Sequence, residues 1–131
     1  MTSESESLYD TRFFFEHYYS KDASVLRWTR DELRSSQTKY ASAITAHELY
    51  KISLENGGRQ VAELRTVLLD KEFEVIDMGL ELAKESAEIR SKYRVPMADS
   101  IIAATTKLNR LECVSDDPHL REIREIKTRW F

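Results

Sequence analysis

The chain has 131 residues, of which 41% are hydrophobic and 33% charged, and its formal net charge is −3. This length and balance predict one globular domain, residues 7–131, and the longest apolar runs are too short to cross a membrane. The acidic, serine-rich start, residues 1–6, predicts a flexible tail rather than a secretory signal. The single cysteine, Cys113, excludes an internal disulfide and indicates a reducing, cytoplasmic setting.

The first third of the chain predicts a strand followed by two helices. Residues 8–10 form a short strand candidate that ends in an acid. The aromatic run 13–19 fits a strand or a helix, and we predict a short helix because residues 10–11 offer a turn and a cap before it. Asp22 caps the next helix, over about 23–36, which carries its arginines on the exposed side.

The middle of the chain predicts two strands with two helices between them. Residues 39–44 are the second strand candidate, and a helix over 45–56 ends at the glycine pair 57–58. A further helix covers about 59–69, and residues 72–76 form the third strand.

The last third predicts two helices before the fourth strand. A long helix is capped by Asp77 and runs to about Tyr93. Pro96 suits the first turn of the next helix, where its missing N–H costs nothing. This helix has an apolar stripe at Ala98, Ile101, Ile102, Thr105 and Leu108.

A short strand, an acidic turn and an edge strand complete the chain. Residues 111–114 suit a buried strand, residues 115–118 a turn, 120–125 a helical turn and 126–131 an edge strand of either direction. Because strands alternate with helices, we predict a three-layer α/β fold with a mainly parallel central sheet of four to five strands flanked by helices.

Acidic residues stand at strand ends or helix starts along the whole chain. Asp10 ends the first strand, and Glu48 follows the second by one helical turn. Asp99 begins its helix, and Asp116 and Asp117 follow the fourth strand. In a parallel sheet all these places lie on one rim, where carboxylates repel one another unless a cation holds them. Mg²⁺ or Mn²⁺ would suit oxygen ligands and would activate water for phosphodiester hydrolysis.

Each acid also has a purely structural explanation. Asp10 would cap the following helix, and Glu48 with Thr45 forms the capping-box pattern T-x-x-E. Asp99 would favour the positive end of its helix, and residues 116–118 would simply form a turn. The pattern alone leaves both explanations open.

The same residues resemble the PIN-domain ribonucleases, especially the VapC-like toxins. Residues 10–11 match the family's opening D-T, and Glu48 its second acid. The stretch A-D-S-I-I-A-A at 98–104 is very similar to its A-D-A-I-I-A-A signature. S-D-D-P-H-L at 115–120 resembles its closing T-x-D-x-x-F, which makes Asp117 the fourth acid. The departures are Arg12 after D-T and the replacement of the closing Thr and Phe by Ser and Leu.

The resemblance implies a PIN-like fold and a Mg²⁺- or Mn²⁺-dependent endoribonuclease, with RNA as substrate, a homodimer and a small antitoxin as partner. It implies four catalytic and metal-binding acids: Asp10, Glu48, Asp99 and Asp117. It also implies a further metal ligand at the neighbouring Asp116 and supporting hydroxyls at Thr11 and Ser115. The alternative is a catalytically inactive PIN-like module that binds RNA or protein.

Two further groups, the basic residues and the histidines, can be interpreted as structural or as functional. The basic residues after the first acid form a solvated helix face or a wall that grips RNA phosphates: Arg12, Lys21, Arg27 and Arg30. The histidines lack zinc-site spacing, so we assign them structural or surface roles: His17, His47 and His119.

Helical spacing divides the aromatic run between two faces. Phe14 and Tyr18 share one face, and Phe15 and Tyr19 share a neighbouring one. We expect one pair to face the sheet and the other to be available to a partner.

Overall fold

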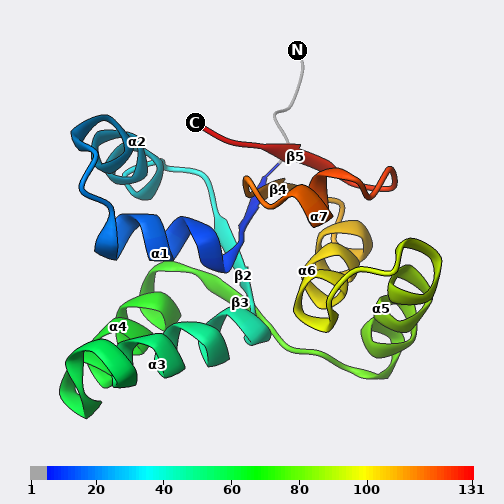
Figure 1. Ribbon diagram of the computed structural model, residues 1–131, viewed down its shortest axis with the longest axis horizontal. Helices are drawn as coiled ribbons and strands as arrows, with labels where there is room; N and C mark the ends of the chain where they lie inside the picture. Colours follow the sequence, from blue (N-terminus) through cyan, green and yellow to red (C-terminus); the bar gives the residue numbers. More distant parts are fainter. Residues whose placement is uncertain (1–5) are drawn as a thin grey trace.

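The computed structural model describes residues 6–131, so the predicted tail falls outside the described residues except for Glu6. These residues form five strands in one sheet with helices on both faces (Figure 1). The strands are β1 (Ser7–Tyr9), β2 (Lys39–Ser42), β3 (Glu74–Ile76), β4 (Glu112–Val114) and β5 (Lys127–Arg129). The helices are α1 (Thr11–Tyr19), α2 (Ala23–Leu33), α3 (Ala43–Gly57), α4 (Arg59–Glu72), α5 (Leu80–Tyr93), α6 (Met97–Leu108) and α7 (Pro118–Arg121).

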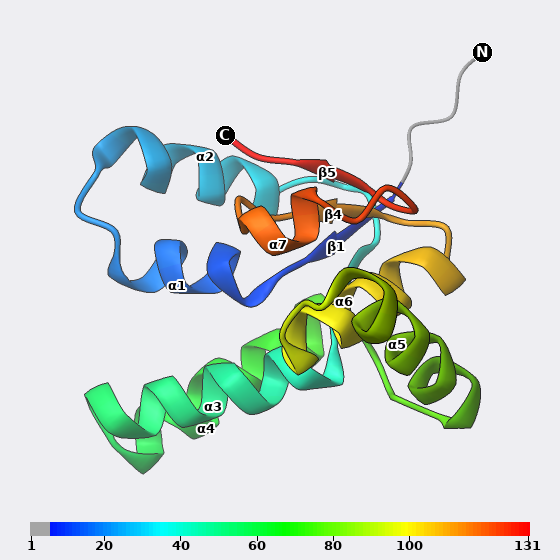
Figure 2. The ribbon, with the colours of Figure 1, turned by 45° about the vertical axis from the view of Figure 1, so that its right-hand side comes forward.

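The two faces of the sheet pack against different helices. Successive strand residues point to opposite faces, so Leu8 and Cys113 join the core beneath α5 and α6. Their neighbours Tyr9 and Val114 join the core beneath α1, α3 and α4. Figure 2 shows α3 and α4 together on one side of the molecule and α5 and α6 on the other. The predicted three-layer α/β architecture is therefore confirmed.

All neighbouring strands are parallel, in the order β3-β2-β1-β4-β5. The chain builds outward from β1 on one side through β2 and β3, then returns to the other side of β1 with β4. The order therefore reverses between β1 and β4, and a crevice forms beyond the carboxyl ends of strands at such a point. The last strand, whose direction the sequence left open, pairs parallel with β4.

Helix α6 is enclosed far more completely than its predicted stripe implied. Eight consecutive residues, 99–106, are buried. The hydroxyls of Thr105 and Thr106 donate to the carbonyls four residues earlier, at 2.7 and 2.8 Å, so their burial leaves no polar atom unpaired. Leu108, which we predicted to lie in the stripe, is 36% exposed because the helix ends there, at the surface.

Three predicted helix starts are wrong. Helix α3 begins at Ala43, since the Ser42 hydroxyl accepts from Ile44 N at 3.1 Å; Thr45 is therefore inside the helix and no Thr45–Glu48 capping box forms. Helix α5 begins after Gly79 rather than after Asp77. The helical turn predicted at 120–125 lies at 118–121, because Pro118 suits a first helical position.

Within residues 6–131, no helix is long and apolar enough to span a bilayer.

Candidate metal centre

Asp10 and Ser115 leave adjacent strands at the same level. The register pairs Tyr9 with Val114, so the next residue of each strand stands beside the other at the carboxyl edge of the sheet. Ser115 Oγ donates to Asp10 Oδ2 at 2.6 Å, and Thr11 N donates to Asp10 Oδ1 at 2.7 Å. Asp10 is 3% exposed and also occupies the N-cap of α1. The predicted cap and the predicted site residue are thus the same side chain.

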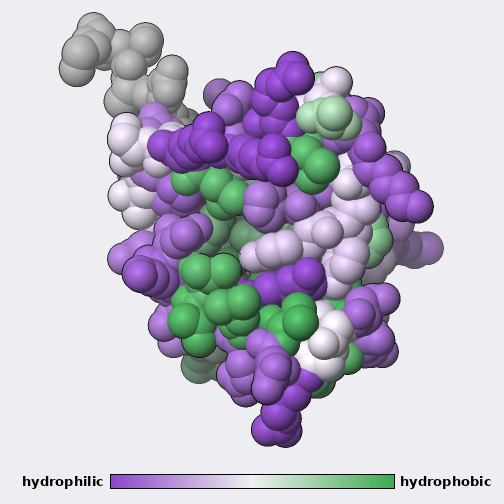
Figure 3. Space-filling model, turned by 90° about the vertical axis from the view of Figure 1, so that its left-hand side faces the viewer, coloured by the Kyte–Doolittle hydropathy of each residue, from purple (hydrophilic) through white to green (hydrophobic). Residues whose placement is uncertain are grey.

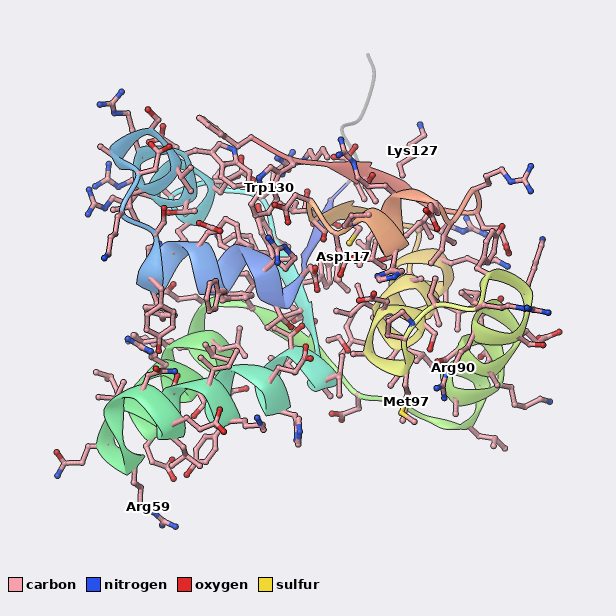
Figure 4. All side chains as sticks on the ribbon, viewed as in Figure 1. Arg59, Arg90, Met97, Asp117, Lys127 and Trp130 are labelled. Carbon is pink, nitrogen blue, oxygen red and sulfur yellow. The ribbon has the colours of Figure 1, made fainter. Side chains whose placement is uncertain are left out.

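A second set of ligand atoms comes from α6 and from the turn after β4. Asp99, Asp117 and His119 each offer one ligand atom, and these atoms all lie within 4.8 Å of one another. His119 Nδ1 is 3.3 Å from Asp99 Oδ2 and 3.2 Å from Asp117 Oδ1. Figure 4 shows Asp117 in the middle of the molecule, between β1 and α6. Asp10 is outside this 4.8 Å group but close enough to raise the pKa of Asp99.

Glu48 reaches the same edge from α3. Its Oε1 accepts a 2.5 Å hydrogen bond from the hydroxyl of Thr11, which also lies 3.2 Å from Thr45 Oγ1. Thr11 therefore contacts both acids, Glu48 through its hydroxyl and Asp10 through its backbone N–H. The negative charge of Glu48 also contributes to a raised pKa at Asp10.

The acids oppose one another electrostatically. Burial, followed by repulsion from Asp117 and Glu48, raises the pKa of Asp10 to about 6, against the hydrogen bonds from Ser115 and Thr11. Burial, with repulsion from Asp117 and Asp10, raises the pKa of Asp99 to about 7. These buried carboxylates repel one another and offer oxygen ligands. Such a set fits a hard divalent cation such as Mg²⁺ or Mn²⁺.

Asp116 is turned to a different partner. Both of its carboxylate oxygens accept from the guanidinium of Arg12, across the mouth of the cluster. Arg12 is the only one of the four predicted basic residues that contacts an acid of this group, since Arg27 and Arg30 are exposed on α2 and Lys21 in the turn before it.

One histidine lies beside the acids. We gave all three histidines structural or surface roles, and the exposed His119 lies on the surface between two of the acids. His17 instead contacts Thr29 Oγ1 at 3.0 Å, and His47 is exposed on α3. The available signal was the sequence Asp117-Pro118-His119, in which an N-cap acid bonds the backbone two residues on.

Comparison with known families settles the family of this chain. The sequence matches the family model of the PIN domain over residues 8–126. The protein belongs to the PIN domain family. A comparison with curated proteins found no match.

Several solved structures share its fold. DNA-bound VapBC from Salmonella typhimurium has a TM-score of 0.78 at 19% identity, covering 97% of this chain and 98% of that chain. VapBC2 from Rickettsia felis, bound to a promoter DNA fragment, has a TM-score of 0.77 at 13% identity, covering 95% and 98%. VapC20 from Mycobacterium tuberculosis, described as a sarcin–ricin loop cleaving toxin, has a TM-score of 0.72 at 14% identity, covering 92% and 98%. At these identities the likeness concerns the fold.

Proposed function

We propose that this protein is a Mg²⁺- or Mn²⁺-dependent ribonuclease that hydrolyses RNA phosphodiester bonds. The observation that carries the proposal is the meeting of Asp10, Asp99 and Asp117 at the switch point of a PIN-domain sheet, with two of these acids holding a raised pKa. RNA is the proposed substrate because one protein of the same fold is described as cleaving the sarcin–ricin loop.

The donor set fits the ion. We propose that Asp10, Asp99 and Asp117 hold the metal and that Glu48 completes the acidic pocket. A bound divalent ion would lower the pKa of water and offset the negative charge that develops on a phosphodiester. We assign no ligand role to Asp116, since both of its carboxylate oxygens accept from Arg12.

The protein's own residues orient these acids. Ser115 Oγ donates to Asp10 and accepts from the backbone N of Asp117 at 3.0 Å, so one hydroxyl fixes two acids from neighbouring segments. Thr11 fixes Glu48 in the same way. Glu48 is then placed to accept a proton or to orient a water molecule beside the scissile phosphate.

Arg12 is the proposed contact for the RNA backbone. It is exposed, stands at the mouth of the acidic cluster and already forms a two-point contact with a carboxylate. Guanidinium groups bind phosphate with the same geometry. Lys21, before α2, and Arg27 and Arg30, on α2, would extend this positive charge more distantly from the acids.

We propose that the apolar side of α1 and α4 binds a small antitoxin protein. Figure 3 views this side of the molecule and shows apolar side chains gathered over its lower half. Phe15 is 46% exposed, and Leu64 and Val67 are each 59% exposed. Exposed apolar patches of this kind mark interaction sites. Several proteins of the same fold were solved as toxin–antitoxin complexes, among them one from Klebsiella pneumoniae. A homodimer is a second proposed assembly.

A cleavage assay tests the proposal. Purified protein is incubated with single-stranded and structured RNA in Mg²⁺, in Mn²⁺ and in EDTA, and the products are separated on denaturing gels. We expect cleavage with either metal and none in EDTA. RNA that binds but stays intact in both metals would contradict the nuclease and support the inactive binding module.

A further inference from the structure

We infer that His119 is a direct ligand in this centre and that its imidazole nitrogen makes the site favour Mn²⁺ over Mg²⁺. The inference rests on the proposed function, since it concerns the metal that the acids hold. It adds a nitrogen donor to a set that the sequence motifs describe as oxygen alone.

The contacts of His119 are those expected of a metal ligand in a metal-free site. Its Nδ1 lies 3.3 Å from Asp99 Oδ2 and 3.2 Å from Asp117 Oδ1. Two ligands bound about 2.1 Å from one ion, at right angles, are about 3 Å apart. An ion could therefore bind all three atoms with small movements of the side chains.

The local backbone fixes the imidazole in this place. Asp117 is the N-cap of α7, and its Oδ1 accepts from His119 N at 2.9 Å. Helical side chains lean toward the N-terminus of their helix, so the imidazole turns back over the cap residue. The same turn thus orders both an acid and a histidine at the cluster.

Burial does not explain this position, because the His119 side chain is 51% exposed. Its hydrogen-bond and ion-pair partners among the described residues are Asp99 and Asp117. The guanidinium of Arg12 is already paired with Asp116. The imidazole is therefore the nitrogen group that faces the centre.

A nitrogen donor changes which ion binds best. Mg²⁺ is a hard ion that takes oxygen ligands and retains its waters, whereas imidazole is a ligand of first-row transition ions. Replacing the imidazole by an oxygen donor should weaken Mn²⁺ binding more than Mg²⁺ binding. If His119 only donates a hydrogen bond to the acids, the two ions should be affected alike.

Pulsed electron paramagnetic resonance of bound Mn²⁺ tests this directly, because a coordinated ¹⁴N nucleus modulates the spin echo. The protein is used without a histidine tag. His119→Asn places an amide oxygen near the position of Nδ1, and His47→Asn is the matched control at an exposed histidine. We expect ¹⁴N coupling in the parent and in His47→Asn, and its loss in His119→Asn.

Competition between the two ions gives a second readout. We expect the Mn²⁺/Mg²⁺ affinity ratio of His119→Asn to fall about tenfold, the scale of a metal-site partner. Bound Mn²⁺ without ¹⁴N coupling in the parent, or coupling that survives in His119→Asn, would overturn the inference and leave the proposed nuclease standing. A parent protein that binds Mg²⁺ but no Mn²⁺ would also overturn the inference alone, whereas one that binds neither ion would overturn both.

Discussion

The sequence pattern left open whether Glu48 caps α3 or belongs to the acidic site. Ser42 caps the helix, while Glu48 accepts from Thr11 beside the acidic cluster. In Glu48→Gln the hydrogen bond survives but the charge is lost. We expect its unfolding free energy to stay within about 1 kcal/mol of the parent, the scale of one hydrogen bond. RNA cleavage should fall about 100-fold or more.

The matched control is Ser42→Ala, measured by urea unfolding and by the same cleavage assay. It removes the cap bond to Ile44 N and should cost about 1 kcal/mol of stability while leaving cleavage near the parent rate. A Glu48→Gln protein that is destabilised yet fully active would show that this acid is structural.

Ser115 should matter through the two acids that it orients. Ser115→Ala removes its bonds to Asp10 Oδ2 and Asp117 N, and we expect Mn²⁺ affinity to fall about 10- to 100-fold. Ser115→Thr keeps the hydroxyl and should retain most of the affinity. Calorimetric titration with Mn²⁺ distinguishes them, and equal affinities of Ala, Thr and parent proteins would contradict a positioning role.

For single residues, the sequence predicted which acids lie at the site better than it predicted which side chains contact one another. Asp10 and Asp99 were predicted because strand ends and helix starts share a rim, whereas only the family resemblance distinguished Asp117 from Asp116. The Arg12–Asp116 pair joins residues 104 apart in the chain, and spacing gives no signal for such a contact. His119 was missed because its orientation depends on where α7 begins.

Helix α1 separates its aromatic residues by face. Phe13 and Phe14 are buried, and Phe15 is 46% exposed, so the pair that contains Phe14 faces the sheet. The tyrosines separate less sharply, because Arg65 lies over the rings of both Tyr18 and Tyr19, at 4.2 and 5.1 Å. The sequence pattern predicted the division between Phe14 and Phe15 but could not show that one arginine from α4 covers both tyrosines.

A pair of substitutions in α1 tests which face is free. Phe14→Ser should cost about 3–5 kcal/mol, which is much of the stability of a domain this size, and leave the protein marginally stable in urea unfolding. Phe15→Ser should stay folded, within about 1 kcal/mol by urea unfolding, and should weaken self-association in sedimentation. A parent that is monomeric at high concentration would contradict the homodimer and leave the nuclease proposal unaffected.

Across the whole molecule, the fold was predictable because local patterns agreed with one another. Helices alternate with short apolar strands, a pattern that is typical of a parallel sheet. The direction of β5 was not predictable, because the segment between α7 and β5 is short and its path depends on tertiary contacts. The start of α3 was displaced by two residues because Ser42 rather than Thr45 precedes the helix and caps it.

The acidic cluster makes stability depend on pH and metal. Asp99 has a pKa of about 7 and Asp10 about 6, both above the ordinary value of 3.8. Between about pH 4 and pH 7 the native state therefore holds protons that the unfolded chain has released, so the unfolding free energy of metal-free protein falls as pH rises. Mn²⁺ should oppose this fall by binding the native state.

Thermal melts in EDTA and in Mn²⁺ across this pH range measure the effect. In EDTA, Asp99→Asn should lose less stability than the parent between pH 4 and 7, because one carboxyl with a raised pKa is gone. Parallel curves for the two proteins would show that Asp99 is not the group responsible.

The most direct test of the metal centre is RNA cleavage by Asp99→Asn in saturating Mn²⁺. The substitution keeps the size of a side chain buried at the start of α6 and removes one ligand charge. We predict a folded protein, shown by an unchanged circular dichroism spectrum, whose cleavage is lost together with Mn²⁺ binding. A folded Asp99→Asn protein that cleaves RNA at the parent rate would contradict the assignment of this cluster as the catalytic centre.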